Sequence, residues 1–160
     1  YQADRLEEAL KVSEENGLAR YETLQPEYNL YAREEYERSL APVVQRHGLG
    51  VINFFSLASG FLTGKYRSEK DIGKSQRGDT IVERYLNPRG FKILAALDRV
   101  AEKHHTSPTQ VSLAWLIARP DIAAPIVSAT SLKQLDELIS ATRLRLDAED
   151  IRILNDASAW

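Results

Sequence analysis

Three short segments of the chain carry residue types that suit a phosphate group or a planar ligand. They are Gln-Pro-Glu-Tyr-Asn at 25–29, the run 54–60 with Thr-Gly-Lys at 63–65, and Ser-Ala-Thr-Ser at 128–131. Small residues leave backbone N–H groups accessible and Lys65 adds positive charge, so the second segment has the composition of a phosphate site. Thr130 and Ser131 place hydroxyls where a helix is expected to begin, and the helix dipole favours an anion there.

The phosphate-binding interpretation has an alternative in each of these segments. The glycines of 60–64 also fit an ordinary loop: the spacing is one residue too short for a P-loop, and Tyr66 replaces its Ser or Thr. Thr130 and Ser131 also fit a plain helix N-cap, and Gln134 fits the partner of a capping box.

Three further side chains near these segments are open to two interpretations. Phe54 either stacks on a planar ligand or packs in the core. Gln25 either binds an amide or bonds to nearby backbone, and Glu137 either accepts a hydrogen bond from an amine or is only solvated.

Other kinds of chemistry find little support. The chain has no cysteine and no metal-ligand spacing, which argues against a thiolate site or a metal site. His47 and His105 fit favourable positions near helix ends, and no nucleophile–base set is apparent. A net charge of −2 gives no general attraction to nucleic acid. No apolar run approaches the ~18 residues of a membrane span, so we expect a cytoplasmic protein without a membrane partner.

The elements that must position these residues alternate between helices and strands. We expect helices over 3–16 and 33–47, from Asn87, from Ser107 to Ala118, beyond Ser131 and after Asp147. Strands are expected over 21–25, 51–55 and 123–127, and a loop from Ser56 to about Leu86. In the helix expected from Asn87, the apolar stripe is expected to include Phe91. In the helix expected beyond Ser131, it is expected to include Leu135, Leu138 and Ile139. This alternation predicts an α/β fold with about three parallel strands, whose carboxyl ends gather at one edge.

Taken in order, three motifs resemble the C-terminal half of an aldo-keto reductase. They are QPEYNL at 25–30, VINFFSLASGFLTGKY at 51–66 and PIVSATSLKQLDELISA at 125–141. The resemblance extends to bacterial reductases related to potassium-channel β subunits. It implies that residues 1–160 form the C-terminal portion of one (β/α)8 TIM barrel domain: strands 6 to 8, a long cofactor loop over about 56–86 and the C-terminal helix.

The resemblance also implies NADP(H) as the cofactor and assigns residues to it. Gln25 is expected to bind the nicotinamide carboxamide, and Phe54 to stack on the nicotinamide ring. The pyrophosphate is expected to lie along Phe55, Ser56, Leu57, Ala58 and Ser59, with charge from Lys65 and from Arg77 in the long loop. The 2′-phosphate ribose is expected near Ser128, Thr130 and Gln134, and the adenine amine at Glu137.

Several positions depart from the family pattern. The family often reads Tyr-Ser-Pro-Leu where this chain has Phe-Phe-Ser-Leu at 54–57, so we expect the loss of proline to loosen this loop. The usual glycine at 128 is serine, a basic residue that often contacts the 2′-phosphate is absent around Thr130, and Leu138 replaces the usual asparagine. These changes leave the preference for NADP over NAD open.

The resemblance assigns no catalytic residue to this chain, because the family's catalytic tetrad lies on the first four strands. Since the sequence begins at Tyr1 and contains no methionine, we expect it to be part of a longer protein. The expected function is the cofactor-binding half of an oxidoreductase that reduces small aldehydes or ketones. The alternatives are a non-catalytic NADPH-binding regulatory subunit and a free-standing half-barrel. The oligomeric state is not predicted.

Overall fold

Two short parallel strands form the sheet of this structure. In the computed structural model, which describes residues 1–76 and 78–160, β1 (Thr23–Leu24) pairs with β2 (Gly50–Val51) in the register Thr23 to Gly50 and Leu24 to Val51. Isolated bridges extend the contact, joining Glu27 to Phe54 and Val51 to Ile122. The strands predicted over 21–25 and 51–55 are therefore confirmed in place and direction, although they are shorter than expected.

The third predicted strand, over 123–127, is wrong as a regular strand. The chain there is extended and donates three backbone hydrogen bonds to the β2 segment. Ala123 (2.8 Å) and Ala124 (3.3 Å) donate to the Val51 carbonyl, and Ile126 donates to the Asn53 carbonyl (2.9 Å). Pro125 lies between these donors and has no N–H, which interrupts a regular ladder. The segment therefore follows β2 without becoming a full strand.

Helices at the N-terminal end largely follow the sequence prediction. α1 (Ala3–Glu15) ends before Gly17, whose φ of 61° is the left-handed conformation expected there. The helix predicted over 33–47 is present but changes type, because a π-helical stretch, η1 (Tyr36–Leu40), passes into α2 (Ala41–His47). Pro42 has no N–H and its ring crowds the preceding turn, so the wider π turn accommodates it.

The region predicted as a loop over about 56–86 is largely helical, which corrects that prediction. It contains the 3₁₀ segments η2 (Ala58–Thr63) and η3 (Glu69–Lys74), followed by α3 (Gly78–Tyr85). Ile81 and Tyr85 are both buried, and their spacing of four residues places them on one face of α3. This helix is hard to recognise from the sequence, because Ile81 and Tyr85 are the only two large buried apolar residues described in it and charged residues lie between them. Arg77, assigned to the cofactor by resemblance, lies outside the described residues.

Four further helices form the C-terminal part of the molecule. They are α4 (Pro88–Lys103), α5 (Pro108–Ile117), α6 (Leu132–Ala141) and α7 (Ala148–Ala157). Their predicted N-caps are all confirmed, since the side chains of Asn87, Ser107, Ser131 and Asp147 each accept a backbone N–H of the first turn. α5 packs against both α4 and α6, and α4 also packs against α7. Residues 111–116 of α5 are all buried, so this helix is the centre of the core.

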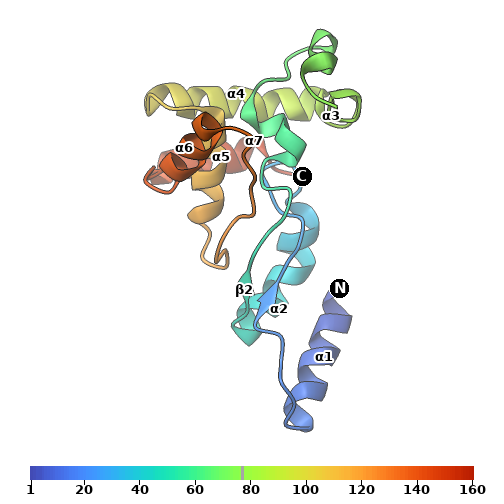
Figure 1. Cartoon of the computed structure of the whole chain (residues 1–160). Helices are drawn as coiled ribbons and strands as arrows, with labels where there is room; N and C mark the ends of the chain where they lie inside the picture. The colour runs from blue at the N-terminus through green and yellow to red at the C-terminus, as the bar shows by residue number, and fades with distance from the viewer. Residues whose placement is uncertain (77) are drawn as a thin grey trace.

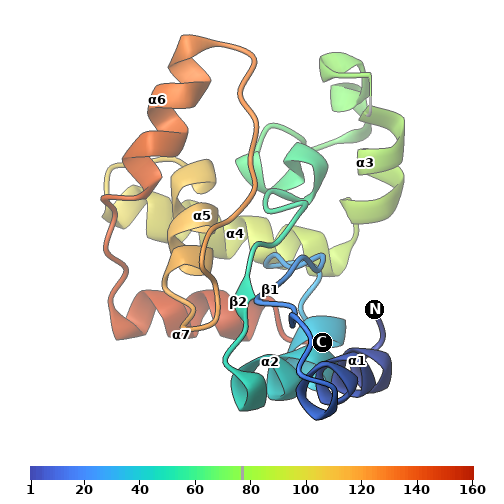
Figure 2. The ribbon, with the colours of Figure 1, turned by 60° about the horizontal axis from the view of Figure 1, so that its bottom comes forward.

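The views in Figure 1 and Figure 2 show how these parts are arranged. α1 lies beside α2 at one end of the molecule, α3 and α6 stand toward the other, and the two strands run between them. In the described residues no helix is both long enough and apolar enough to cross a membrane.

Two predicted apolar stripes are packed less completely than expected. Phe91 on α4 is nearly half exposed, because the buried face of α4 follows Ile93, Leu94 and Leu97 instead. On α6, Leu135 and Ile139 are also exposed, whereas Leu138 is partly buried. α6 packs against α5, so the apolar side of α6 that points away from α5 faces solvent.

Candidate cofactor-binding site

The first two segments singled out in the sequence meet beside the carboxyl ends of β1 and β2, and the chain that leads to the third segment runs alongside them. The Phe54 N–H donates to the Pro26 carbonyl (3.0 Å), which joins the first segment to the second. The Ile126 N–H donates to the Asn53 carbonyl (2.9 Å), which brings the approach to the third segment alongside. The expectation that the strand ends gather at one edge is therefore confirmed for the first two predicted strands, whereas ligand binding by their residues stays a prediction.

Three buried polar side chains connect these strand ends: Ser56, which the resemblance assigns to the pyrophosphate, and two asparagines that sequence reasoning missed, Asn53 and Asn29. Asn53 is fully buried, and its Nδ2 donates to the Tyr28 carbonyl (2.7 Å) and to Ser56 Oγ (3.0 Å). Ser56 Oγ in turn donates to the Ile126 carbonyl (2.8 Å). Asn29, also fully buried, donates from Nδ2 to the Phe55 carbonyl (2.9 Å). The signal that could have found them is a pair of amides within otherwise apolar runs at strand ends.

Phe54 and Phe55 form the aromatic part of the site. Their rings meet edge to face with centroids 5.1 Å apart. Phe54 is partly buried, and Phe55 is 41% exposed with a φ of 52°, which is unusual for a bulky residue. Ring surface is therefore available at the end of β2, as the stacking hypothesis for Phe54 requires.

A left-handed turn follows the two rings. Ala58, Ser59 and Gly60 have φ values of 49°, 57° and 96°. Internal bonds hold the turn, since the Ala58 N–H donates to the Phe55 carbonyl (2.7 Å) and the Gly60 N–H donates to the Leu57 carbonyl (2.9 Å). Backbone strain of this kind concentrates at functional sites. The buried side chain of Ala58 leaves only its backbone to serve a ligand, as the resemblance implies for this run.

Lys65 lies next to this turn and is exposed. A Cβ built on Gly60 would lie 3.8 Å from Lys65 Nζ, so the ammonium group approaches the backbone of the turn directly. Among the described residues no carboxylate forms an ion pair with Lys65. The positive charge that the sequence predicts at this segment is therefore present, and it is accessible from solvent.

The third segment leads into the N-terminus of α6. Ser128 and Thr130 are exposed, and Ser131 is the N-cap, accepting from the Gln134 N–H (3.3 Å). The predicted capping box is wrong in one respect, because Gln134 Oε1 accepts from the N–H (2.8 Å) and hydroxyl (2.9 Å) of Thr130 instead of from Ser131. Lys133, which sequence reasoning passed over, is exposed in the same helical turn.

Glu137 and Gln25 differ in how firmly the structure holds them. The Glu137 carboxylate accepts a short hydrogen bond from Ser107 Oγ, and its backbone carbonyl accepts from Gln110 Nε2 (3.4 Å). Glu137 is therefore tied to the start of α5 and is not merely solvated. Gln25 is exposed directly after β1, and Leu57 is partly buried between the rings and the turn.

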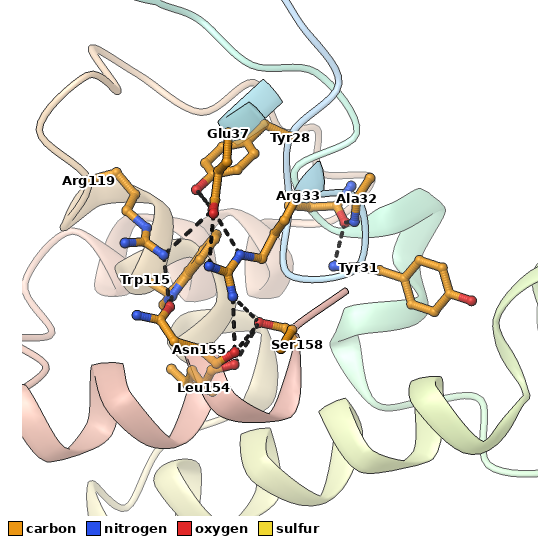
Figure 3. A network of polar contacts seen from close by, with 12 residues as sticks. Tyr28, Tyr31, Ala32, Arg33, Glu37, Trp115, Arg119, Leu154, Asn155 and Ser158 are labelled. Atoms are coloured by element: carbon orange, nitrogen blue, oxygen red, sulfur yellow. Dashed lines mark hydrogen bonds and ion pairs between the residues drawn. The ribbon is translucent and has the colours of Figure 1, made fainter. Parts of the chain in front are cut away.

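Behind the first segment lies a buried charged network (Figure 3). It joins the loop that contains Tyr28 to the C-terminal helix α7. The Arg33 guanidinium donates to both oxygens of Glu37 (2.8 and 3.0 Å), to the Asn155 carbonyl (3.1 Å) and to Ser158 Oγ (2.8 Å). Tyr28 donates its hydroxyl to Glu37 Oε1 (2.7 Å). Burial acts to raise the pKa of Glu37, but hydrogen bonds from Arg33 and Tyr28 outweigh it, so the pKa is lowered. Burial, together with the bond to Glu37, raises the pKa of Tyr28.

Among the described residues, two clefts are lined by neither Phe54, Phe55 nor the left-handed turn at 58–60. One of about 480 Å³ lies between the loop after β1 and the C-terminus, where Glu27, Arg33 and Trp160 contribute to its walls. The other, of about 360 Å³, lies between α1 and the chain leading into β1, with Tyr1 and Tyr21 among its lining residues. The candidate site is therefore a surface formed by three adjoining strand ends.

Comparison with known proteins identifies the family to which this arrangement belongs. The family model described as the aldo/keto reductase family matches residues 1–159. The chain belongs to the aldo/keto reductase family.

Individual members of the aldo/keto reductase family agree with this. The chain is 29% identical over 93% of its length to a putative aryl-alcohol dehydrogenase of Schizosaccharomyces pombe, and 34% identical over 84% to an uncharacterized oxidoreductase of Bacillus subtilis. It is 30% identical over 73% of its length to a probable voltage-gated potassium channel subunit beta of Arabidopsis thaliana. These matches cover 42%, 39% and 37% of the relatives, so the chain spans about two-fifths of their length.

Membership of the aldo/keto reductase family implies a (β/α)8 barrel. The structure shows a helix-rich α/β arrangement with a two-stranded parallel sheet. The prediction that these residues form strands 6 to 8 of such a barrel therefore stays a prediction.

Proposed function

We propose that this chain is the cofactor-binding part of an NADP(H)-dependent oxidoreductase that reduces small aldehydes or ketones. The observation that carries the proposal is that the first two segments, far apart in sequence, meet at the ends of β1 and β2, with the chain that leads to the third segment beside them. In the same place they bring together an exposed amide, two aromatic rings, a strained turn and an unpaired ammonium group. Relatives named as dehydrogenases and oxidoreductases support the reaction class.

The residues present fit a dinucleotide carrying phosphates. Gln25 offers a donor and an acceptor for a carboxamide, and the exposed ring surface at Phe54 and Phe55 suits a flat heterocycle. Lys65 beside the turn at 58–60 provides the charge for a pyrophosphate. Bound NADPH would supply the hydride, which is the cofactor's own chemistry.

The second part of the cofactor is assigned to the start of α6. Thr130 and Gln134 already hold each other in place, which orders two polar side chains before a ligand arrives. With Ser128 they would surround the 2′-phosphate ribose, and Glu137 would accept from the adenine amine. Glu137 would then exchange or share its bond to Ser107.

In this proposal the chain binds and orients, and it supplies no proton donor to the substrate. Tyr28 illustrates the point, because its hydroxyl is committed to Glu37 and its pKa is raised by burial. The residues that protonate the carbonyl oxygen would belong to the part of the longer relatives that this chain does not span. A cytoplasmic location is part of the same proposal.

The direct test is cofactor binding and turnover by the intact protein. Titration with NADPH, followed by fluorescence, is expected to show saturable binding, and addition of a simple aromatic aldehyde is expected to oxidise the NADPH. A parallel titration with NADH measures the cofactor preference that the changes around Thr130 leave open. Absence of NADPH binding would overturn the proposal.

A non-catalytic NADPH-binding subunit is the second candidate function. Its support is the 30% identity to proteins named as potassium channel subunits beta, from Arabidopsis thaliana and Schizosaccharomyces pombe. NADPH binding without turnover across a broad panel of aldehydes and ketones would favour this function over the first. The third possibility, a free-standing half-barrel, predicts a mature protein whose measured mass matches 160 residues.

A further inference from the structure

Two polar residues, Asn53 and Ser56, interrupt the otherwise apolar run at the end of β2. Asn53 is 0% exposed and Ser56 is 1% exposed, and they lie on either side of Phe54 and Phe55. Burial of an amide or hydroxyl is unfavourable unless its hydrogen bonds are made inside the protein. The bonds that these two residues make therefore constrain where the chain between them can lie.

Those bonds reach all three strand ends. Asn53 Nδ2 donates to the Tyr28 carbonyl in the first segment and to Ser56 Oγ in the second. Ser56 Oγ donates to the Ile126 carbonyl, two residues before Ser128 in the third segment. Removing Asn53 leaves the buried Tyr28 carbonyl without this donor, and removing Ser56 takes a donor from the partly buried Ile126 carbonyl. A buried carbonyl without a donor costs more than the net value of the bond itself.

A third side chain, the amide of Asn29, holds the same backbone from the first segment. Asn29 donates to the Phe55 carbonyl (2.9 Å), while its Oδ1 accepts from the N–H groups of Tyr31 and Ala32 (both 2.8 Å). The dipeptide Phe54-Phe55 is thus flanked on both sides, and bonded at its last carbonyl, by side chains that do not themselves face solvent. Hydrogen bonds of Ser56 hold the chain at the position where the family pattern has proline, and the expectation that loss of this proline loosens the loop stays a prediction.

We propose that Asn53 and Ser56, supported by Asn29, are positioning residues of the cofactor site. They set the backbone of Phe54 and Phe55 relative to the first and third segments, so that the rings and the turn at 58–60 present one continuous surface to the dinucleotide. They touch no ligand themselves. This inference rests on the proposed function, since it assigns a role within the same site.

The test compares Ser56→Ala with Ser112→Ala in the intact protein. Both changes remove one hydroxyl from a side chain that is 1% exposed, and Ser112 Oγ makes only a long bond to the Leu62 carbonyl (3.4 Å). Ser56→Ala is expected to raise the dissociation constant of NADPH about tenfold, the effect of one lost hydrogen bond at a buried position. Ser112→Ala is expected to leave that constant within about twofold of wild type.

The kinetic parameters distinguish a positioning role of Ser56 from a merely structural one. If Ser56 positions the rings, the KM for NADPH rises while kcat changes little; general destabilisation lowers the active fraction, and so kcat, at unchanged KM. Asn53→Ala and the double variant complete a cycle, in which the double variant is expected to bind NADPH no worse than the weaker single variant. Should Asn53→Ala fail to fold, the Ser56 and Ser112 pair decides alone.

The outcomes are distinguishable. Wild-type affinity for NADPH in Ser56→Ala, or an equal loss in Ser112→Ala, overturns the positioning role while leaving the proposed function standing. Failure of the wild-type protein to bind NADPH overturns the proposed function, and the inference with it.

Discussion

Lys65 is the residue whose charge the proposed site can least easily replace. It is exposed, approaches the turn at Gly60 and has no carboxylate partner among the described residues. An unpaired ammonium group beside strained backbone can meet an anion without first breaking an ion pair. This single residue therefore separates a phosphate-binding turn from an ordinary one.

We expect Lys65→Ala to weaken NADPH binding by about 1–3 kcal/mol, the range for a charge-assisted hydrogen bond. The rate of hydride transfer in single-turnover experiments at saturating NADPH is expected to change far less. Lys70→Ala is the control, because Lys70 is equally exposed but lies in η3. Unchanged NADPH affinity in Lys65→Ala would place Lys65 outside the site.

Arg33 differs from Lys65, because its charged group is already bonded to other residues of the protein. It is 7% exposed, is bonded to Glu37, Asn155 and Ser158, and lies 4.9 Å from the ring centre of Trp160. Replacing it removes the partner of a partly buried carboxylate, which is among the most destabilising single changes.

Arg33→Met is accordingly expected to lower the free energy of unfolding by about 3 kcal/mol, as measured by urea denaturation. Arg38→Met serves as the control, since Arg38 forms an exposed ion pair with Glu34 and its loss is expected to cost less than about 1 kcal/mol. Equal losses of unfolding free energy in the two variants would show that the buried network stabilises the protein no more than an exposed ion pair does.

At the scale of elements, the contact between α4 and α7 depends on a buried carboxylate. Asp150 is fully buried and accepts from Lys103 Nζ (2.8 Å), and its other oxygen lies 2.7 Å from His104 Nε2. It also closes the capping box with Asp147 at the start of α7. Burial acts to raise the pKa of Asp150, but the bonds from Lys103 and His104 outweigh it and hold the pKa below its ordinary value.

This lowered pKa predicts an acid-dependent loss of stability. Because the pKa of Asp150 is lower in the folded than in the unfolded state, its contribution is complete above the unfolded value of about 3.9 and is lost as the pH falls toward the folded value. Asp147, whose pKa the Lys103 hydrogen bond lowers to about 2, acts in the same direction.

Asp150→Asn is therefore expected to reduce the free energy of unfolding at pH 7 by about 2 kcal/mol. It is also expected to flatten the decline in stability between about pH 5 and pH 2. Denaturant titrations across that range measure both effects. Asp156→Asn, at an exposed position of the same helix, is the control. A decline as steep as that of wild type would show that Asp150 is not the titrating group.

Sequence reasoning at this scale succeeded where the signal is local. Asn87 and Ser107 are followed by proline and the helical periodicity, and both begin helices as predicted. It failed at a proline inside an apolar run and at contacts between residues far apart in the sequence. The run at 123–127 has the composition of a strand, yet Pro125 prevents a regular ladder with β2. Likewise, the bond from Ser107 to Glu137 joins two helices, so no local pattern predicts it.

For the whole molecule, the proposed cofactor contacts run from Gln25 to Glu137 and so involve most of the chain. In the unfolded state these residues are not held together, so NADPH would bind the folded state almost exclusively. Ligand that binds only the folded state stabilises it by RT ln(1 + [L]/Kd), which is about 2.7 kcal/mol at a hundredfold excess over Kd. The buried Asn53 and Asn29 contacts already join the strand ends without ligand, so little of this energy is needed to assemble the site.

We therefore expect saturating NADPH to raise the Tm of the intact protein by several degrees, with a shift that follows the logarithm of NADPH concentration above Kd. AMP, which offers only an adenine and one phosphate, is expected to give a much smaller shift at the same concentration. Lys65→Ala is expected to displace the whole concentration dependence to higher NADPH by the same factor as its loss of affinity, which ties the thermal measurement to the site. A Tm that stays constant at NADPH concentrations saturating the fluorescence signal would mean that the bound nucleotide does not engage the folded strand ends.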